Sequence, residues 1–209
     1  YVTPKLDGMA GKDIDGVLAS RGNGLVGNDI THIFDRGVLA IGGRNQGVGE
    51  IVMVLSYFEE NFANEFTHPR NMVAGIVNSD EINAYSQKAL DSGMVHFLPY
   101  TQLANTAQWQ GNEKDFIDKI EQITQDLAEK TDYPLDGMVA EIRNPKIQKF
   151  LGSTSHHNKW QIAIKTRGET ARTEIESIGW QTGRTGTVTP VLRIKPTKLS
   201  GATIRNVTA

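Results

Sequence analysis

The chain brings a lysine, an aspartate and a glycine together close to its first residue, in the stretch KLDG. A lysine amine can serve as a nucleophile when burial or neighbouring cations lower its pKa, because the neutral amine is the form that attacks an electrophile. The same stretch also fits a surface turn, since Asp-Gly is a common pairing in two-residue hairpins and a lysine beside it is usually solvated. The local sequence leaves both interpretations of Lys5 and Asp7 open.

Other polar residues along the chain could complete a site around such a lysine. The glycine-rich segment SRGNGLVGNDIT carries Arg21, and glycine-rich backbone lets a phosphate approach amide groups, although a lone Gly-x-Gly is a weak signal. In PRN, Arg70 follows a rigid proline. In DGMVAEI, strand alternation puts Asp136 and Glu141 on opposite faces unless a bulge intervenes. In KWQIAIKT, Lys165 faces a polar cleft or solvent, and solvent is the commoner environment.

The sequence predicts mostly short strands as the elements that position these residues. Six segments rich in Val, Ile and aromatic residues are bounded by Gly, Pro or Asn: 16–22, 49–58, 94–100, 136–142, 159–166 and 187–196. Apolar residues recur at helical spacing over 112–131, which predicts one surface helix, and a weaker helical pattern covers 79–93. With 21 glycines as well, the pattern favours antiparallel sheet with irregular connections over a helical bundle.

Composition limits the class of protein. The 209 residues, 38% of them hydrophobic, are enough for one good core and part of a second, so we expect one domain and an appendage. No run approaches the roughly 18 apolar residues of a membrane span, and the first residues lack the features of a signal peptide. The absence of cysteine excludes disulfides and thiolate zinc sites within these residues. We therefore expect a soluble, cytoplasmic protein without a membrane partner.

Charge is distributed unevenly along the chain. Residues 1–142 carry 10 Lys and Arg against 21 Asp and Glu, whereas residues 143–209 carry 12 against 3, so a segment of −11 precedes one of +9. A segment this basic suggests contact with a polyanion such as nucleic acid, because neutralisation of phosphates supplies most non-specific affinity. A solvated basic face is the alternative.

The order of the motifs is more specific than any one of them. KLDG, SRGNGLVGNDIT, GEIVM, HPRNMVAG, LDGMVAEI, KWQIAIK and WQTGRTGTVTPVLRIKPTKLSGATIRN together resemble the adenylation domain of an NAD-dependent DNA ligase running into its OB-fold. The resemblance covers nearly all the chain, and WQTGRTGTVTPV separates this family from the ATP-dependent ligases and capping enzymes. It implies an α+β nucleotidyltransferase (adenylation) fold of antiparallel sheets with flanking helices over residues 1–167, followed by the first strands of an OB-fold β-barrel over 168–209.

The resemblance also implies a reaction and a set of site residues. Lys5 would attack the α-phosphorus of NAD, hold AMP, and pass it to a 5′-phosphate at a nick in duplex DNA, so that the 3′-hydroxyl can seal the strand. The two catalytic residues would be Lys5 and Asp7. The residues implied for nucleotide binding are Arg21, Glu50, Arg70, Tyr100, Asp136 and Lys165. Arg184 and Lys195 would bind DNA phosphates. Asp136 and Glu141 would bind Mg²⁺, because carboxylates are its usual ligands.

Several positions depart from the family pattern. Glu141 stands where the pattern has a lysine, Asn78 where it has a second arginine, Asn23 where it has an aspartate, and Thr3 where it has a glutamate. The family's module for the nicotinamide mononucleotide half, most of the OB-fold and further DNA-clamping modules are not represented here, so we expect other domains or a second subunit to supply them. The alternative function is a catalytically weakened nick-binding or assembly subunit of a split ligase.

Overall fold

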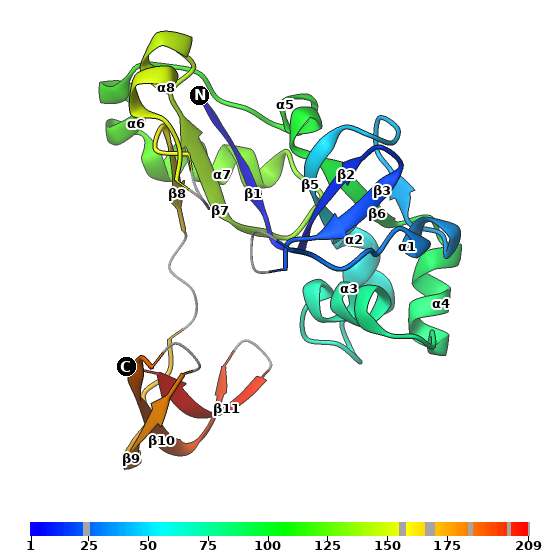
Figure 1. Ribbon diagram of the computed structural model, residues 1–209, viewed down its shortest axis with the longest axis vertical. Coiled ribbons are helices and arrows are strands. Elements are labelled where there is room, and N and C mark those ends of the chain that lie inside the picture. Colours follow the sequence, from blue (N-terminus) through cyan, green and yellow to red (C-terminus); the bar gives the residue numbers. More distant parts are fainter. Residues whose placement is uncertain (23–25, 155–157, 166–169, 184–185, 200–201, 209) are drawn as a thin grey trace. The chain divides into compact units, whose positions relative to one another are not determined.

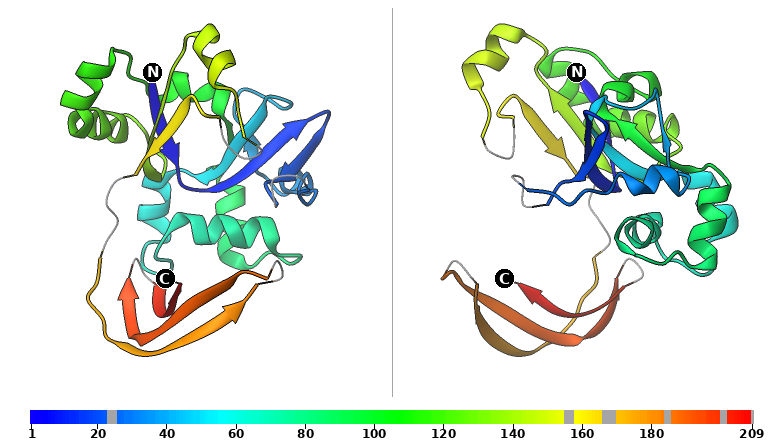
Figure 2. Two further views of the ribbon diagram at one scale, coloured as in Figure 1. Left: turned by 60° about the vertical axis from the view of Figure 1, so that its left-hand side comes forward. Right: turned by 45° about the vertical axis from the view of Figure 1, so that its right-hand side comes forward.

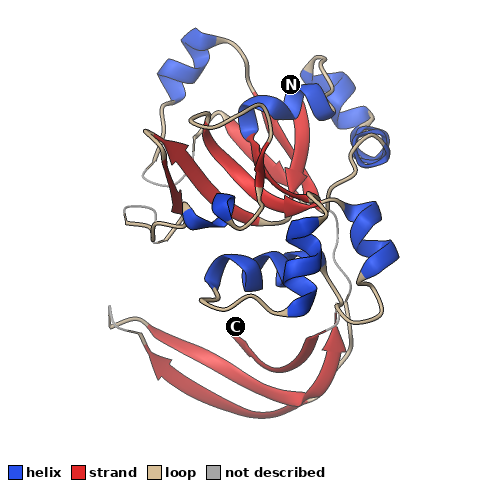
Figure 3. Cartoon of the chain, turned by 90° about the vertical axis from the view of Figure 1, so that its right-hand side faces the viewer, coloured by secondary structure: helices blue, strands red, loops and turns tan. Residues whose placement is uncertain are grey.

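The structure is a computed structural model that describes residues 1–22, 26–154, 158–165, 170–183, 186–199 and 202–208. It comprises two compact units, Tyr1–Thr166 and Arg167–Ala209. Helices and strands occur together, as expected for an α+β chain (Figure 3). Within the described residues, no helix is long and apolar enough to span a membrane.

A five-stranded sheet forms the larger core of the first unit. Its strand order is β3 (Val17–Ser20), β2 (Met9–Ile14), β5 (Gly47–Met53), β6 (Val95–Pro99) and β4 (Leu39–Ala40), and all neighbours are antiparallel except the pair β4 and β6. Buried Leu18, Ile51 and Phe97 of the sheet share one apolar cluster with Phe58 and Ile76 of the helices. The four helices of this region are α1 (His32–Asp35), α2 (Leu55–Asn61), α3 (Pro69–Asn78) and α4 (Ala84–Asp91) (Figure 2).

A three-stranded antiparallel sheet forms the second core of this unit. Its order is β1 (Val2–Leu6), β7 (Leu135–Glu141) and β8 (Gln161–Ile164). Val2 and Met138 are buried against Ile123 and Leu127 of α7 (Ile120–Glu129), which covers one face of the sheet (Figure 1). The surrounding short helices are η1 (Tyr100–Gln102), α5 (Leu103–Thr106), α6 (Glu113–Asp118) and α8 (Pro145–Leu151). Alternation along β1 then directs Thr3 and Lys5 to the opposite face.

The KLDG stretch joins the two sheets. Lys5 lies in β1 of the smaller sheet, and β2 of the larger sheet begins two residues after Asp7. At Gly8 the backbones approach so closely that an added Cβ would lie 2.1 Å from the Ile51 carbonyl oxygen, which excludes any other residue without a shift of backbone. KLDG is therefore a crossover between sheets and not a hairpin turn, and it puts Lys5 and Asp7 at the junction of both cores.

The second unit consists of strands over its described residues. β9 (Ile175–Thr182), β10 (Val188–Leu199) and β11 (Ala202–Thr208) pair antiparallel in the order β11, β10, β9. The register shifts between Arg193 and Thr197 in the pairing with β11, and the sheet curls, as its ribbon shows (Figure 2). Lys195, which was expected to contact DNA phosphates, is exposed, and its Nζ lies 2.5 Å from Oε2 of Glu174. Arg184, expected beside it, lies outside the described residues.

Two expected elements differ from those observed, and a distant contact accounts for the first of them. The strand expected over 49–58 ends at Met53, and α2 begins at Leu55. Asp132 fixes this change, since its carboxylate accepts hydrogen bonds from the Ser56 backbone and hydroxyl at 2.9 and 2.6 Å. The single helix expected over 112–131 is two helices, separated at Lys119, whose ψ of 17° is not helical. The helices α3 and α8, each starting with a proline, were not expected.

A buried ion pair ties the β2–β3 hairpin to the segment before β5. Asp13 is fully buried, and Arg44 donates to both of its carboxylate oxygens at 2.8 and 2.9 Å. The Asn45 backbone N–H donates to the same carboxylate at 2.6 Å, and the Arg44 guanidinium lies 3.9 Å from the centroid of the Phe34 ring. Burial raises the pKa of Asp13, but the Arg44 and Asn45 hydrogen bonds outweigh it and hold the pKa below its ordinary value. The pair thus favours the ionised carboxylate despite its burial.

We predict that Asp13→Asn lowers the free energy of unfolding by about 2 kcal/mol, because it leaves Arg44 without its charged partner. Urea denaturation of the variant and of the parent chain at neutral pH measures the difference. Asp15→Asn is the matched control, since Asp15 is exposed at the tip of the same hairpin with a φ of 52°, a conformation that asparagine tolerates. Equal stability of the two variants would contradict a stabilising role for the buried pair.

Candidate active site

A cavity of about 680 Å³ lies between the two sheets of the first unit. Its lining comes from β1, the crossover to β2, the end of β3, β5, the start of α3, η1, α5 and β7. Most residues that the sequence suggested line it, namely Lys5, Asp7, Arg21, Glu50, Arg70, Tyr100 and Glu141. Segments that are more than a hundred residues apart in the sequence therefore line one cavity.

Lys5, which lines the cavity, contacts Asp136, and neither Asp136 nor Lys165 is itself a lining residue. Lys5 Nζ donates to Asp136 Oδ2 at 2.7 Å, and Lys165 Nζ lies 3.0 Å from the same oxygen. Burial by itself raises the pKa of Asp136, but the hydrogen bonds from the two lysines outweigh it and lower the pKa. One carboxylate thus holds two ammonium groups side by side, an arrangement in which each lysine also feels the other's positive charge.

A bulge in β7 makes this contact geometrically possible. Between Pro4 and Leu6 of β1, the paired strand advances from Met138 to Leu135, so β7 contains an extra residue. Gly137 lies in that interval with a φ of 120°, and an added Cβ would lie 2.1 Å from the Ile164 carbonyl oxygen. The sequence left open whether a bulge interrupts the alternation of side chains between Asp136 and Glu141. The bulge at Gly137 does so and lets Asp136 reach Lys5.

Glu50 and Tyr100 form a second polar pair in the cavity. Tyr100 donates its hydroxyl proton to Glu50 Oε2 at 2.6 Å, and the Glu50 residue is only 8% exposed. Burial raises the pKa of Glu50, against the opposing effects of the Tyr100 hydrogen bond and the charge of Lys5. Burial and the neighbouring Glu50 carboxylate also raise the pKa of the Tyr100 hydroxyl. Tyr100 therefore remains a neutral hydrogen-bond donor at physiological pH, while Glu50 is destabilised as an anion.

Arg21 and Arg70 are two further cationic residues near Lys5. Both line the cavity, and Arg70 Nη1 donates to Asp7 Oδ1 at 2.9 Å. Asn78 also lines it, but its amide donates to the Ala74 carbonyl oxygen of its own helix at 3.0 Å. The two arginines, and not position 78, supply positive charge here.

Glu141 lines the cavity beside Tyr1, away from Lys5 along the strand. Its backbone N–H donates to the Tyr1 carbonyl oxygen, so four residues of β1, or about 13 Å at the usual rise per residue, separate it from Lys5. Gln161 Nε2 donates to Glu141 Oε2 at 2.9 Å, and Arg143 Nε lies 3.7 Å from Oε1. Gln161 and Arg143 also line the cavity and were not anticipated. Gln161 was recognisable, since it shares a strand face with Lys165.

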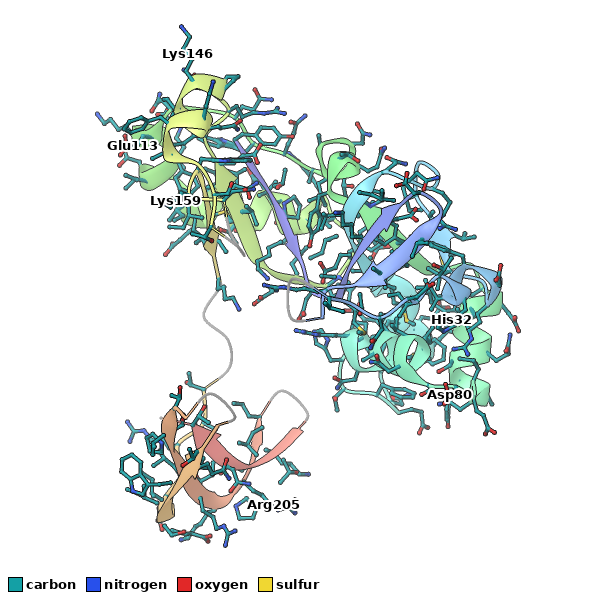
Figure 4. The ribbon with its side chains drawn as sticks, in the orientation of Figure 1. His32, Asp80, Glu113, Lys146, Lys159 and Arg205 are labelled. Carbon is teal, nitrogen blue, oxygen red and sulfur yellow. The ribbon has the colours of Figure 1, made fainter. Side chains whose placement is uncertain are left out.

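The expected metal ligands do not meet. Asp136 and Glu141 are near the two ends of β7, and the Asp136 Oδ2 atom is already occupied by two lysines. Lys146, a basic residue that follows β7 in the chain, extends outward from α8 (Figure 4). Over the part of the chain that the structure describes, no group of three His, Asp or Glu residues could hold a metal ion. Asp136 and Glu141 therefore do not form a shared Mg²⁺ site.

Comparison with known proteins finds DNA ligases. The family model of the NAD-dependent DNA ligase OB-fold domain matches residues 172–209. Over the whole chain, the sequence is 55% identical to a DNA ligase of Desulfatibacillum aliphaticivorans and covers 32% of that protein. It is 41% identical, over 99% of the chain, to a DNA ligase of Psychromonas ingrahamii, of which it also covers 32%. The chain thus spans about a third of the length of these curated relatives, and the resemblance to NAD-dependent DNA ligases is confirmed.

We predict that Glu50→Gln stabilises the chain increasingly as the pH rises. A raised carboxyl pKa means that ionisation is less favourable in the folded chain, so the stability contributed by Glu50 is full below its unfolded pKa and is lost as the pH rises through its folded pKa. Glutamine does not ionise and can still accept the Tyr100 hydrogen bond. Urea denaturation between pH 4 and 8 should give similar stabilities at the acid end and a more stable variant at the neutral end. Glu60→Gln on the exposed side of α2 controls for loss of charge alone, and a variant less stable than the parent at pH 8 would refute the prediction.

Proposed function

We propose that this relative of the NAD-dependent DNA ligases contains their nucleotidyltransferase core, residues 1–167, and the first strands of their OB-fold, residues 168–209. In this proposal, Lys5 takes AMP from NAD and the AMP then activates the 5′-phosphate of a nick in duplex DNA. The observation that carries the proposal is the contact of Lys5 and Lys165 with one Asp136 oxygen, at 2.7 and 3.0 Å, beside a cavity large enough for a nucleotide.

The first step needs a neutral lysine beside positive charge. Lys5 Nζ loses its proton to solvent, and Asp136 Oδ2, at 2.7 Å, holds the amine in place. Nζ then attacks the α-phosphorus, a P–N bond forms, and the P–O bond to nicotinamide mononucleotide breaks. Lys165, on the far side of Asp136, supplies positive charge where the phosphorus oxygens gain negative charge.

The remaining cavity residues orient the nucleotide. The ring of Tyr100 is the stacking surface for adenine, and its hydroxyl fixes the Glu50 carboxylate, which accepts from the ribose. Arg21 and Arg70 face the phosphates. Since no metal site is formed by the described residues, no step here is assigned to Mg²⁺. In the second and third steps, the AMP passes to the 5′-phosphate and the 3′-hydroxyl displaces it.

One observation favours the alternative, a nick-binding or assembly subunit with weakened chemistry. The cavity contains Glu141 where the family pattern has a cation, and the amide of Asn78 is engaged by its own helix. Both changes remove positive charge from a site for an anionic substrate. Nicked-duplex binding without formation of an AMP adduct would favour this alternative over the enzyme.

We predict that Lys5→Ala abolishes covalent attachment of AMP, because it removes the nucleophile. Intact mass after incubation with NAD and Mg²⁺ should show one added AMP on the parent chain and none on the variant. Lys12→Ala, which removes an exposed lysine of β2, should retain the adduct. An adduct that persists in Lys5→Ala would assign the nucleophile to another residue.

We predict that Glu141→Gln lowers KM for NAD about two- to fivefold with little change in kcat, because a charge about 13 Å along the strand acts on binding more than on bond formation. The glutamine can keep its contacts with Gln161 and Arg143. Initial rates of adduct formation over a range of NAD concentrations separate the two constants. A large fall in kcat would put Glu141 next to the reacting phosphorus.

A further inference from the structure

His68 lies directly before α3 and contacts both that helix and the KLDG stretch. Its Nδ1 accepts a hydrogen bond from the Arg70 backbone N–H at 3.1 Å and caps the helix. Its Nε2 lies 3.5 Å from Oδ2 of Asp7. One side chain therefore touches, through its two ring nitrogens, two residues that line the same part of the cavity.

The cap determines which nitrogen carries the proton. Because Nδ1 accepts from Arg70, the neutral ring of His68 carries its hydrogen on Nε2, the nitrogen that faces Asp7. Arg70 Nη1 donates to the other oxygen of that carboxylate at 2.9 Å. Asp7 Oδ1 thus accepts from Arg70, while Asp7 Oδ2 faces the Nε2 atom of His68 at 3.5 Å.

The contacts form a closed ring of three residues. His68 fixes where α3 begins, the first turn of α3 carries Arg70, Arg70 binds Asp7, and Asp7 returns to His68. The side chain of Asp7 is 19% exposed, whereas that of Arg70 is 57% exposed. A long exposed arginine loses much rotamer freedom when it is held in one place, so a second constraint on its partner makes that arrangement more persistent.

We propose that His68 is a positioning residue that holds Asp7 and Arg70 in one arrangement toward the phosphates of the bound dinucleotide. His68 does not itself line the cavity and acts through these two residues. The proposal rests on the adenylation function proposed above. It adds a residue to which neither the motifs nor the comparisons assign a role.

Two variants separate positioning from helix capping alone. His68→Asn keeps an acceptor for the Arg70 N–H, since asparagine is among the best N-cap residues, but it presents no ring nitrogen to Asp7. His68→Ala removes both contacts. His32→Asn is the matched control, because His32 is exposed on α1 (Figure 4).

The test measures the unfolding temperature and the rate of AMP-adduct formation at saturating NAD. We expect His68→Asn to unfold at the same temperature as the parent chain. Its rate of AMP-adduct formation should fall about tenfold, because a substrate-binding group is misplaced. His68→Ala should lose both stability and rate, and His32→Asn neither. A parent-like rate in His68→Asn would reduce His68 to a helix cap and overturn the proposal.

A second measurement does not depend on activity. In long-range ¹H–¹⁵N spectra of the histidine rings, His68 should show an unprotonated Nδ1 and a protonated Nε2, and Asp7→Asn should shift its Nε2 signal. A ring protonated on Nδ1, or an unmoved Nε2 signal, would overturn the proposal. A parent chain that forms no adduct, with these ring signals as expected, would instead count against the adenylation function alone.

Discussion

A single carboxylate that binds two lysines organises the candidate site. Lys5 on β1 and Lys165 at the end of β8 lie on the strands that flank β7, and Asp136 of β7 meets both at one oxygen. Without that anion, two ammonium groups this close would repel each other. The pairing therefore allows two cations to remain together beside the cavity that Lys5 lines.

The crossover between sheets gives this arrangement its second constraint. Gly8 permits the backbone of the KLDG stretch to pass directly against β5, so the smaller sheet with Lys5 adjoins the larger sheet with Glu50. Each sheet buries its own apolar cluster, and a third cluster joins Leu6 of β1 to Val52 of β5 and Leu98 of β6. The polar residues are left to line the space between them, where burial raises the pKa of Glu50 and hydrogen bonds lower that of Asp136.

The cavity contains charges of both signs along the strands. Arg21, Arg70 and Lys5 line it together with Asp7 and Glu50, whereas Glu141, with Arg143 beside it, lies about 13 Å away along β1. The charge reversal at position 141 therefore lies four residues along the strand from Lys5, and its effect on a phosphate beside Lys5 falls with that distance.

The sequence by itself determined the family and the α+β class, and most of the site residues that it suggested line the cavity, because the ordered motifs carry the chemistry directly. Alternation along β8 was also enough to put Lys165 and Gln161 on one face. Only the tertiary structure decided that Asp136 reaches Lys5, through a bulge at Gly137, and that Asp136 and Glu141 lie too far apart to share a metal. It alone revealed that Asp132 starts α2 and that His68 meets Asp7. A local sequence pattern specifies which side chains share a face of a strand or helix. The contacts of Asp136, Asp132 and His68 join residues far apart in the sequence, and only packing brings those residues together.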